Sequence, residues 1–110
     1  MGGFCGVISR QDCVSDLFFG TDYHSHLGTH RGGMALLGKD GFQRSIHNIQ
    51  NAPFRSKFDQ DFARFSGNVG IGVISDTDPQ PLVMCSKLGT FAIVTVGLLA
   101  NIAELKKELF

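Results

Sequence analysis

Apolar and polar residues along this chain follow two patterns, one typical of strands and one typical of helices. Apolar runs at 4–8, 34–37 and 42–46 predict short strands. The last two runs are separated by a segment that ends in Asp40-Gly41, and Asp-Gly between apolar runs is a common hairpin signal. These two runs are therefore predicted to pair as a hairpin.

Three later runs predict further strands. The run at 67–74 is spaced by glycines, which within a strand often mark a close approach of another backbone. No helix opens behind these glycines, so they do not fit a dinucleotide-binding or phosphate-binding loop. The runs at 82–85 and 91–96 complete the set, and the second of them is predicted to be buried on both faces.

Helical spacing marks segments at both ends of the chain. Apolar residues at helical intervals behind Asp12 predict a capped helix over roughly 13–27 that ends at Gly28. Near the end of the chain, Asn101 and Glu104 resemble a capping box in front of a last amphipathic helix. Mixed strands and helices of this kind predict an α+β fold.

Phenylalanine dominates the helix predicted after Pro53, a residue that suits the first turn. Four rings follow at spacings of four, four and three, which places them on one helical face. They are Phe54, Phe58, Phe62 and Phe65. We interpret this stripe as facing the core. The charged residues on the other faces are interpreted as solvated, namely Lys57, Asp59, Asp61 and Arg64.

Composition narrows the class of protein. The 110 residues are 43% hydrophobic, which is typical of one small globular domain, and no apolar stretch is long enough to span a membrane. Ten basic residues balance ten acidic ones, which argues against a nucleic-acid partner. Three cysteines, with no signal-peptide pattern, indicate a reducing, cytoplasmic compartment.

A histidine-rich segment offers two interpretations. His24, His26 and His30 resemble a metal site, but on a helix only His26 and His30 share a face, and no spacing completes four ligands. We therefore expect no metal. The following Arg31, between a histidine and two glycines, suits an anionic or carbonyl-bearing ligand. The alternative is a loop with a surface arginine.

Cys5 is the residue on which a catalytic interpretation depends. If the mature chain begins at Cys5, its thiol and α-amino group belong to one residue, which gives a nucleophile with its own base. If it does not, Cys5 is an inert buried thiol, the usual state of free cysteine.

Five segments occur in the order and spacing of the class II glutamine amidotransferases, namely Phe4-Cys5-Gly6-Val7-Ile8, Thr29-His30-Arg31-Gly32, residues 64–72, Gln80-Pro81 and the helix after Gly97. The chain most resembles the N-terminal domain of the amidophosphoribosyltransferases, and the resemblance covers nearly all of it. It implies the N-terminal portion of an αββα sandwich of the N-terminal-nucleophile hydrolase type. Residues 1–110 would then be an incomplete glutamine amidotransferase type 2 domain.

The resemblance also implies roles for individual residues. Cys5 is the nucleophile once residues 1–4, a short propeptide, are removed. Its thiolate attacks the glutamine carboxamide, and its own α-amino group, which titrates near pH ~7.7–8.0, moves the protons. The backbone N–H of Gly97 is the oxyanion donor. His30, Arg31 and Gly32 form the substrate-binding loop beside the site.

Partners follow from the same resemblance. Ammonia from glutamine would pass to a phosphoribosyltransferase domain beyond residue 110, where it displaces pyrophosphate from phosphoribosyl pyrophosphate in purine biosynthesis. Mg²⁺ is expected only in that absent domain, and no cofactor is expected in this one. The full-length protein is expected to be a homo-oligomer, and the 110-residue piece is expected to be inactive alone.

Two departures from the family pattern favour an alternative. The arginine that clamps the glutamine carboxylate falls at Ser75, followed by Asp76, and the asparagine of the oxyanion pair falls at Val96. Loss of one oxyanion donor typically costs ~10²–10³ in rate, and loss of a charged clamp ~2–5 kcal/mol. The alternative is a degenerate, non-catalytic module with a structural or regulatory role. A histidine-based metal module is a remote third.

Overall fold

The computed structural model describes residues 2–27 and 30–110, and it is built around one antiparallel sheet. The strand order is β1-β4-β2-β3. The strands are β1 (Gly3–Ile8), β2 (Arg31–Gly38), β3 (Gly41–Asn48) and β4 (Val69–Ser75). The hairpin predicted around Asp40-Gly41 is confirmed, because Gly38 pairs with Gly41 and joins β2 to β3.

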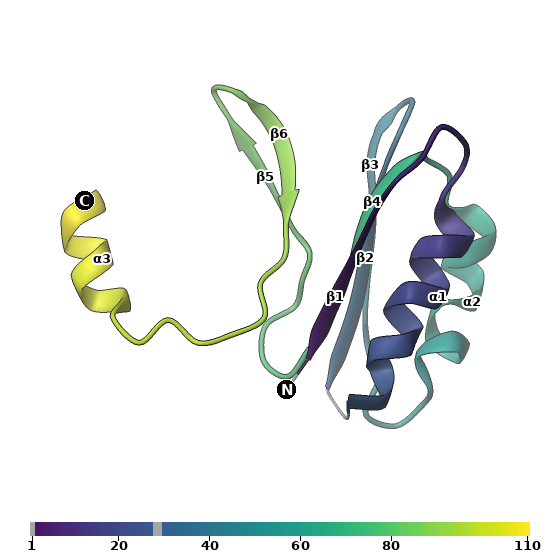
Figure 1. Ribbon diagram of the computed structural model, residues 1–110, viewed down its shortest axis with the longest axis horizontal. Helices are drawn as coiled ribbons and strands as arrows, with labels where there is room; N and C mark the ends of the chain where they lie inside the picture. The colour runs from purple at the N-terminus through teal and green to yellow at the C-terminus, as the bar shows by residue number, and fades with distance from the viewer. Residues whose placement is uncertain (1, 28–29) are drawn as a thin grey trace.

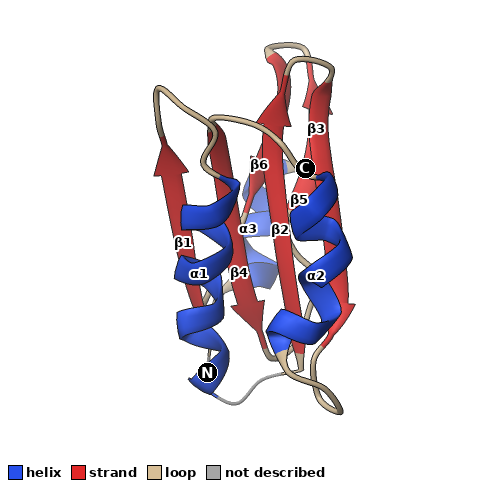
Figure 2. Cartoon of the chain, turned by 90° about the vertical axis from the view of Figure 1, so that its right-hand side faces the viewer, coloured by secondary structure: helices blue, strands red, loops and turns tan. Residues whose placement is uncertain are grey.

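Two helices cover one face of this sheet (Figures 1 and 2). They are α1 (Val14–His24), continued by the 3-10 turn η1 (Ser25–Leu27), and α2 (Phe54–Arg64). The core lies between helices and sheet, where Leu17, Leu36 and Phe58 are fully buried. The phenylalanine stripe of α2 faces this core as predicted, with Phe62 packed at its edge.

Glycines on β4 make room for side chains of α1, whereas the sequence predicted the close approach of another backbone. A Cβ added at Gly72 would lie 1.9 Å from Thr21 Oγ1, and one at Gly70 would lie 2.7 Å from a Leu17 methyl group. Side chains at these positions would push α1 off the sheet. The glycine spacing of β4 is therefore a packing feature.

The opposite face of the sheet is approached by a second, two-stranded sheet made of β5 (Leu82–Ser86) and β6 (Gly89–Ile93). The prediction that the last strand is buried on both faces is wrong. Phe91 is 42% exposed and Ile93 40%, and in the described residues β6 pairs only with β5. A further helix, α3 (Ile102–Leu109), lies apart from the rest in Figure 1, and none of its residues is buried.

Details at the helix ends differ from the predictions. Cys13, not Asp12, is the N-cap residue of α1, although Asp12 Oδ1 accepts a hydrogen bond from the Val14 N–H at 3.0 Å. Asn101 is the N-cap of α3 but makes no side-chain capping hydrogen bond. The predicted helix stop at Gly28 lies outside the described residues.

The mixture of helices and strands confirms the predicted α+β class. In the part of the chain that the structure describes, no helix is both long and apolar enough to cross a membrane.

Candidate active site at the start of the first strand

Cys5 lies in the middle of β1, opposite Gly72 of β4. Its side chain points toward α1, where the absence of a side chain at Gly20 makes room for it: an added Cβ would lie 2.5 Å from Cys5 Sγ. Burial, and then the negative charge of Asp16, raise the pKa of the Cys5 thiol. In this arrangement the thiol stays protonated at neutral pH and is a weak nucleophile.

A second group of residues forms a cavity of about 460 Å³ on the other face of the sheet. The cavity lies where β1 begins and β4 ends, and its wall includes Ser75, Val96 and Gly97. These are three of the positions that the sequence placed in one site, and the fold brings them together. Gly2 forms the wall where β1 begins.

A buried glutamine holds the Val96–Gly97 part of this wall in place. Gln80 is 6% exposed, and its side chain donates to the Thr95 carbonyl at 3.1 Å and accepts from the Thr95 N–H at 2.7 Å. Gly97 follows with a φ of +149°, in a region that side-chain-bearing residues rarely adopt. Gln80 therefore positions the segment that carries the candidate oxyanion donor.

Arg31 and Ser75 are Cα partners on adjacent strands. Side chains alternate along a strand, so Arg31 points to the same face as Gly33, where an added Cβ would meet the Gln80 carbonyl. That face is the one on which the cavity lies. Arg31 and Ser75 are thus neighbours on the cavity side of the sheet.

The other two residues of the predicted binding loop have different surroundings. His30 Nδ1 lies 3.0 Å from the Asp76 carbonyl oxygen, to which it donates, so His30 ties the start of β2 to the end of β4. Gly32 faces the helices: an added Cβ would lie 2.9 Å from the Phe54 ring. Gly32 therefore makes room for the core, and it does not point to the cavity.

Cys5 and the cavity are not brought together in the chain described here. Gly2 lines the cavity and Cys5 lies three residues further along β1, which corresponds to about 10 Å. In addition, the Cys5 side chain points to the helices and the cavity lies on the opposite face. Gly3 and Phe4 keep Cys5 away from the cavity, because both pair with β4 as ordinary strand residues.

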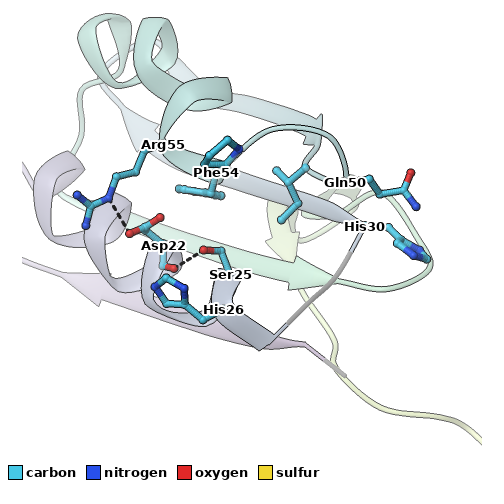
Figure 3. A pocket seen from close by; sticks show the side chains of 9 residues that line it. Asp22, Ser25, His26, His30, Gln50, Phe54 and Arg55 are labelled. Atoms are coloured by element: carbon cyan, nitrogen blue, oxygen red, sulfur yellow. Dashed lines mark hydrogen bonds and ion pairs between the residues drawn. The ribbon is translucent and has the colours of Figure 1, made fainter.

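A pocket of about 590 Å³ on the helix side of the sheet is lined by His26 and His30, among other residues. Figure 3 shows His26 beside Asp22, whereas His30 lies across the pocket. Arg55 Nε donates to Asp22 Oδ2 at 2.8 Å, and this hydrogen bond links α2 to α1 at the pocket. Among the described residues no group of three or more His, Cys, Asp or Glu side chains is arranged to hold a metal ion.

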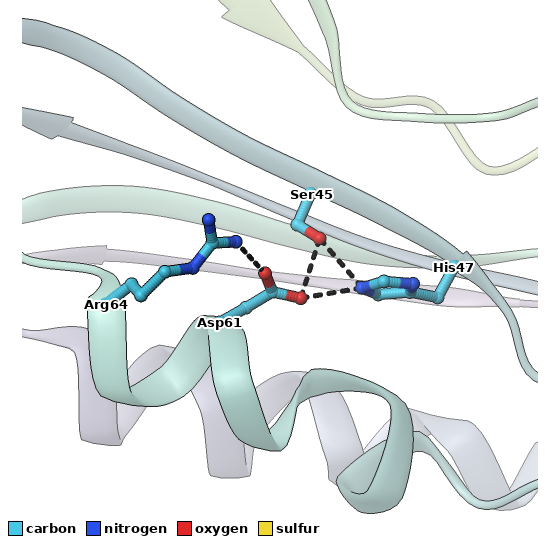
Figure 4. Close-up of polar contacts among 4 residues, drawn as sticks. All are labelled: Ser45, His47, Asp61 and Arg64. Atoms are coloured by element: carbon cyan, nitrogen blue, oxygen red, sulfur yellow. Dashed lines mark hydrogen bonds and ion pairs between the residues drawn. The ribbon is translucent and has the colours of Figure 1, made fainter.

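A polar cluster between β3 and α2 was missed by the sequence interpretation, which placed Asp61 in solvent. Asp61 is only 4% exposed. Its Oδ2 accepts from Ser45 Oγ at 2.7 Å and lies 2.6 Å from His47 Nε2, while Arg64 donates to its Oδ1 (Figure 4). Burial alone would raise the pKa of Asp61, but the bonds from Ser45, His47 and Arg64 outweigh it and lower that pKa.

This cluster is not a catalytic triad. Ser45 Oγ and Asp61 Oδ2 both contact the same nitrogen of His47, whereas a triad places serine and aspartate on opposite ring nitrogens. It is a polar tie between a strand and a helix. The signal that could have revealed it is the i, i+2 spacing of Ser45 and His47, which puts both on the helix-facing side of β3.

Comparison with known proteins adds no family assignment. A scan against protein-family models and a search of the curated proteins both find no match to this chain.

Proposed function

We propose that this chain is the glutaminase-type part of a class II glutamine amidotransferase, resembling the N-terminal domain of the amidophosphoribosyltransferases. The layering supports this proposal: two helices cover one face of an antiparallel sheet, and a second sheet begins on the other face. This is the order of layers expected for the N-terminal portion of an αββα sandwich. The missing part of that sandwich would follow residue 110.

The observation that carries the proposal is the cavity where β1 begins. Segments far apart in the sequence, around Gly2, Ser75 and Gly97, line it together. In an N-terminal-nucleophile enzyme the chain starts at the nucleophile. Removal of residues 1–4 would therefore vacate the strand positions between Cys5 and this cavity, which leaves room for a glutamine side chain.

Each residue then has a step to perform. The Cys5 thiolate attacks the carboxamide carbon, the oxyanion that forms accepts a hydrogen bond from the Gly97 N–H, and ammonia leaves to give a thioester. Water then releases glutamate. The ammonia would serve a phosphoribosyltransferase domain, with Mg²⁺ bound there to phosphoribosyl pyrophosphate, in a cytoplasmic homo-oligomer.

Arg31 replaces the carboxylate clamp that the family has at residue 75. Directly opposed residues of an antiparallel pair have Cβ atoms about 4.5–5.5 Å apart, so an arginine at residue 31 starts next to the point from which an arginine at 75 would extend. Asp76 and Asp78 on the cavity wall make such a positive charge necessary, because they repel a substrate carboxylate.

The test compares two forms of the full-length protein, one that begins at Met1 and one that begins at Cys5, both in a Cys85→Ser background that removes an exposed thiol. An L-glutamine-analogue diazoketone should label Cys5 only in the chain that begins at Cys5, as measured by intact mass. The D-enantiomer and Cys5→Ser are the controls. Equal labelling by both enantiomers, or none by either, contradicts the proposal.

The arginine assignment has its own test in the chain that begins at Cys5. Arg31→Ser should slow labelling at low reagent concentration by about 30-fold or more, the equivalent of a lost ~2 kcal/mol charge contact. Arg31→Ser combined with Ser75→Arg should recover most of the rate, because the charge returns from the other strand. Failure of the double variant to recover contradicts the role of Arg31.

The second candidate is a degenerate module that keeps the fold without catalysis. The observations that favour it are the raised pKa of Cys5 and the absence of side-chain donors at Val96. It predicts that the full-length protein uses free ammonia and not glutamine. Glutamine-dependent product formation by the full-length protein would exclude it.

A further inference from the structure

Strand β1 and helix α1 pack side by side, and Cys5 and His24 belong to two neighbouring layers of contacts between them. Cys5 Sγ lies against Gly20, and Gly3 lies against His24, whose Nδ1 would be 2.4 Å from a Cβ added at Gly3. One layer is four residues along the helix, about 6 Å, and two residues along the strand, about 6.7 Å. The His24 ring is therefore one layer away from the Cys5 thiol, on the same side of the sheet.

In the chain that begins at Met1, the backbone of Gly3 fills the space between β1 and His24. Gly3 pairs with Ile74 and Phe4 pairs with Val73, so this part of β1 is fixed in the sheet. Only glycine at residue 3 lets the imidazole lie against the strand. Removal of residues 1–4 empties this space and leaves the new amino end of the chain next to His24.

We propose that His24 is the proton acceptor for the Cys5 thiol once the chain begins at Cys5. This inference rests on the proposed function and adds a second base to the α-amino group. The S–H bond breaks and its proton moves to an imidazole nitrogen. The thiolate forms an S–C bond with the carboxamide carbon, and the C–N bond breaks as the imidazolium gives its proton to the leaving nitrogen, which departs as ammonia.

Other titratable groups face the same space. Asp16 lies one helical turn before Gly20, and its negative charge opposes a thiolate at Cys5. Tyr23 contacts the His24 ring edge-on, with centroids 5.7 Å apart. β4 presents only uncharged residues here, namely Gly70, Gly72 and Ile74. Of the groups on α1, Asp16 therefore opposes the charged thiol, and His24 is the one placed to accept its proton under the proposal.

The test measures alkylation of Cys5 by iodoacetamide between pH 5 and pH 9, followed by peptide mass spectrometry in the Cys85→Ser background. In the chain that begins at Cys5, His24→Gln should lower the rate at pH 6.5 by about 10-fold, since a histidinium partner lowers a thiol pKa by a unit or more. In the chain that begins at Met1, the same substitution should change the rate less than twofold. His26→Gln is the matched control and should have no effect in either chain.

A second readout needs no substitution. In the chain that begins at Cys5, alkylation of the thiol should shift the NMR titration midpoint of the His24 ring and leave that of His26 unchanged. Unchanged alkylation profiles in His24→Gln, an equal change in both chains, or an unmoved His24 midpoint would each overturn the proposal. Circular dichroism establishes that each variant is folded.

The outcome is separable from that of the proposed function because iodoacetamide does not resemble glutamine. Alkylation that depends on His24, together with no preference for the L-glutamine analogue, keeps the Cys5–His24 pair and rejects the glutaminase. Labelling by the L-analogue at the same rate in His24→Gln keeps the glutaminase and rejects His24 as its base.

Discussion

The two ends of this chain differ in how they are stabilised. The buried apolar side chains of the core cluster lie between Cys13 and Ile74, where two helices close over one sheet, whereas most of the large exposed ones lie after residue 81. In the described residues, β5 and β6 pair only with each other, and an isolated two-stranded hairpin is at best marginally stable. The core region is therefore stable by local packing, and the hairpin region depends on a few contacts with it.

This difference divides the proposed site. Cys5, Arg31 and Ser75 are on strands of the stable sheet, while Val96 and Gly97 are on the segment that follows β6. One half of the proposed site thus lies on the stable sheet, and the other is held by the Gln80–Thr95 hydrogen bonds. The geometry at Val96 and Gly97, the oxyanion position, should therefore be disturbed more easily than that of the residues on the sheet.

The largest expected effect comes from the core. Phe58 is fully buried and stacks on Phe54 with ring centroids 4.3 Å apart. Phe58→Ala should lower the free energy of unfolding by about 3–5 kcal/mol, the usual cost of removing a buried ring. Urea unfolding followed by circular dichroism measures it.

The matched control lies on α3. Ile102 is half exposed, and Ile102→Ala should change the free energy of unfolding by less than about 0.5 kcal/mol. Similar losses in the two variants would show that the regions are equally important for stability, and would remove the contrast between them.

The next effect concerns the close approach of α1 to β4. Gly72→Ala puts a methyl group against Thr21 and should cost about 1–3 kcal/mol of unfolding free energy, as overpacked cores do. Gly6→Ala on β1 is the control, because its added Cβ meets nothing closer than 3.7 Å.

Relief of the clash sharpens this prediction. Thr21 Oγ1 is buried and has no hydrogen-bond partner among the described residues, so Thr21→Ala removes the clashing atom without breaking a bond. Adding Thr21→Ala to Gly72→Ala should restore part of the loss. Additive losses in the double variant would mean that Gly72 matters for another reason.

Hydrophobic periodicity predicted most of the secondary structure because burial against one face sets it. The α2 stripe and the glycine-spaced β4 were identified in this way. The exposure of Phe91 could not be predicted, since an apolar strand looks the same in sequence whether or not another element covers it. Asp61 was misplaced because a buried carboxylate is recognised by its partners, which lie on another element.

The candidate site was predicted less well than the fold. The order of the motifs placed Ser75, Val96 and Gly97 in one site, and the fold brings them to one cavity. The same order does not say which face of β1 carries the Cys5 thiol. That depends on strand register, which the pairing of Gly3 with Ile74 sets. His24 was interpreted only as a remote metal ligand, because its position against Gly3 follows from the packing of α1 on β1.

A smaller and local effect is expected at the link between the two regions. Gln80→Ala removes both hydrogen bonds to Thr95 and should destabilise the hairpin region by about 1–2 kcal/mol. Hydrogen exchange measured by mass spectrometry should become faster in residues 82–97 and stay unchanged in α1 and β4. Gln60→Ala, on the exposed side of α2, is the control. Faster exchange throughout the chain would show that Gln80 supports the whole fold.

The smallest effect is acid-dependent and confined to the core region. The lowered pKa of Asp61 means that its contribution is present above the ordinary aspartate pKa of about 3.9 and is lost as the pH falls through the lowered value. Asp61→Asn should therefore lower the free energy of unfolding at pH 7 by about 1 kcal/mol. The further loss of stability below pH 4 should be smaller in this variant than in the parent chain, by a similar amount. Asp59→Asn, at an exposed position on α2, should leave both unchanged. Urea unfolding at pH 7, 4 and 3 measures how the free energy of unfolding depends on pH. If acid destabilises Asp61→Asn as much as it destabilises the parent chain, then Ser45, His47 and Arg64 do not hold Asp61 ionised.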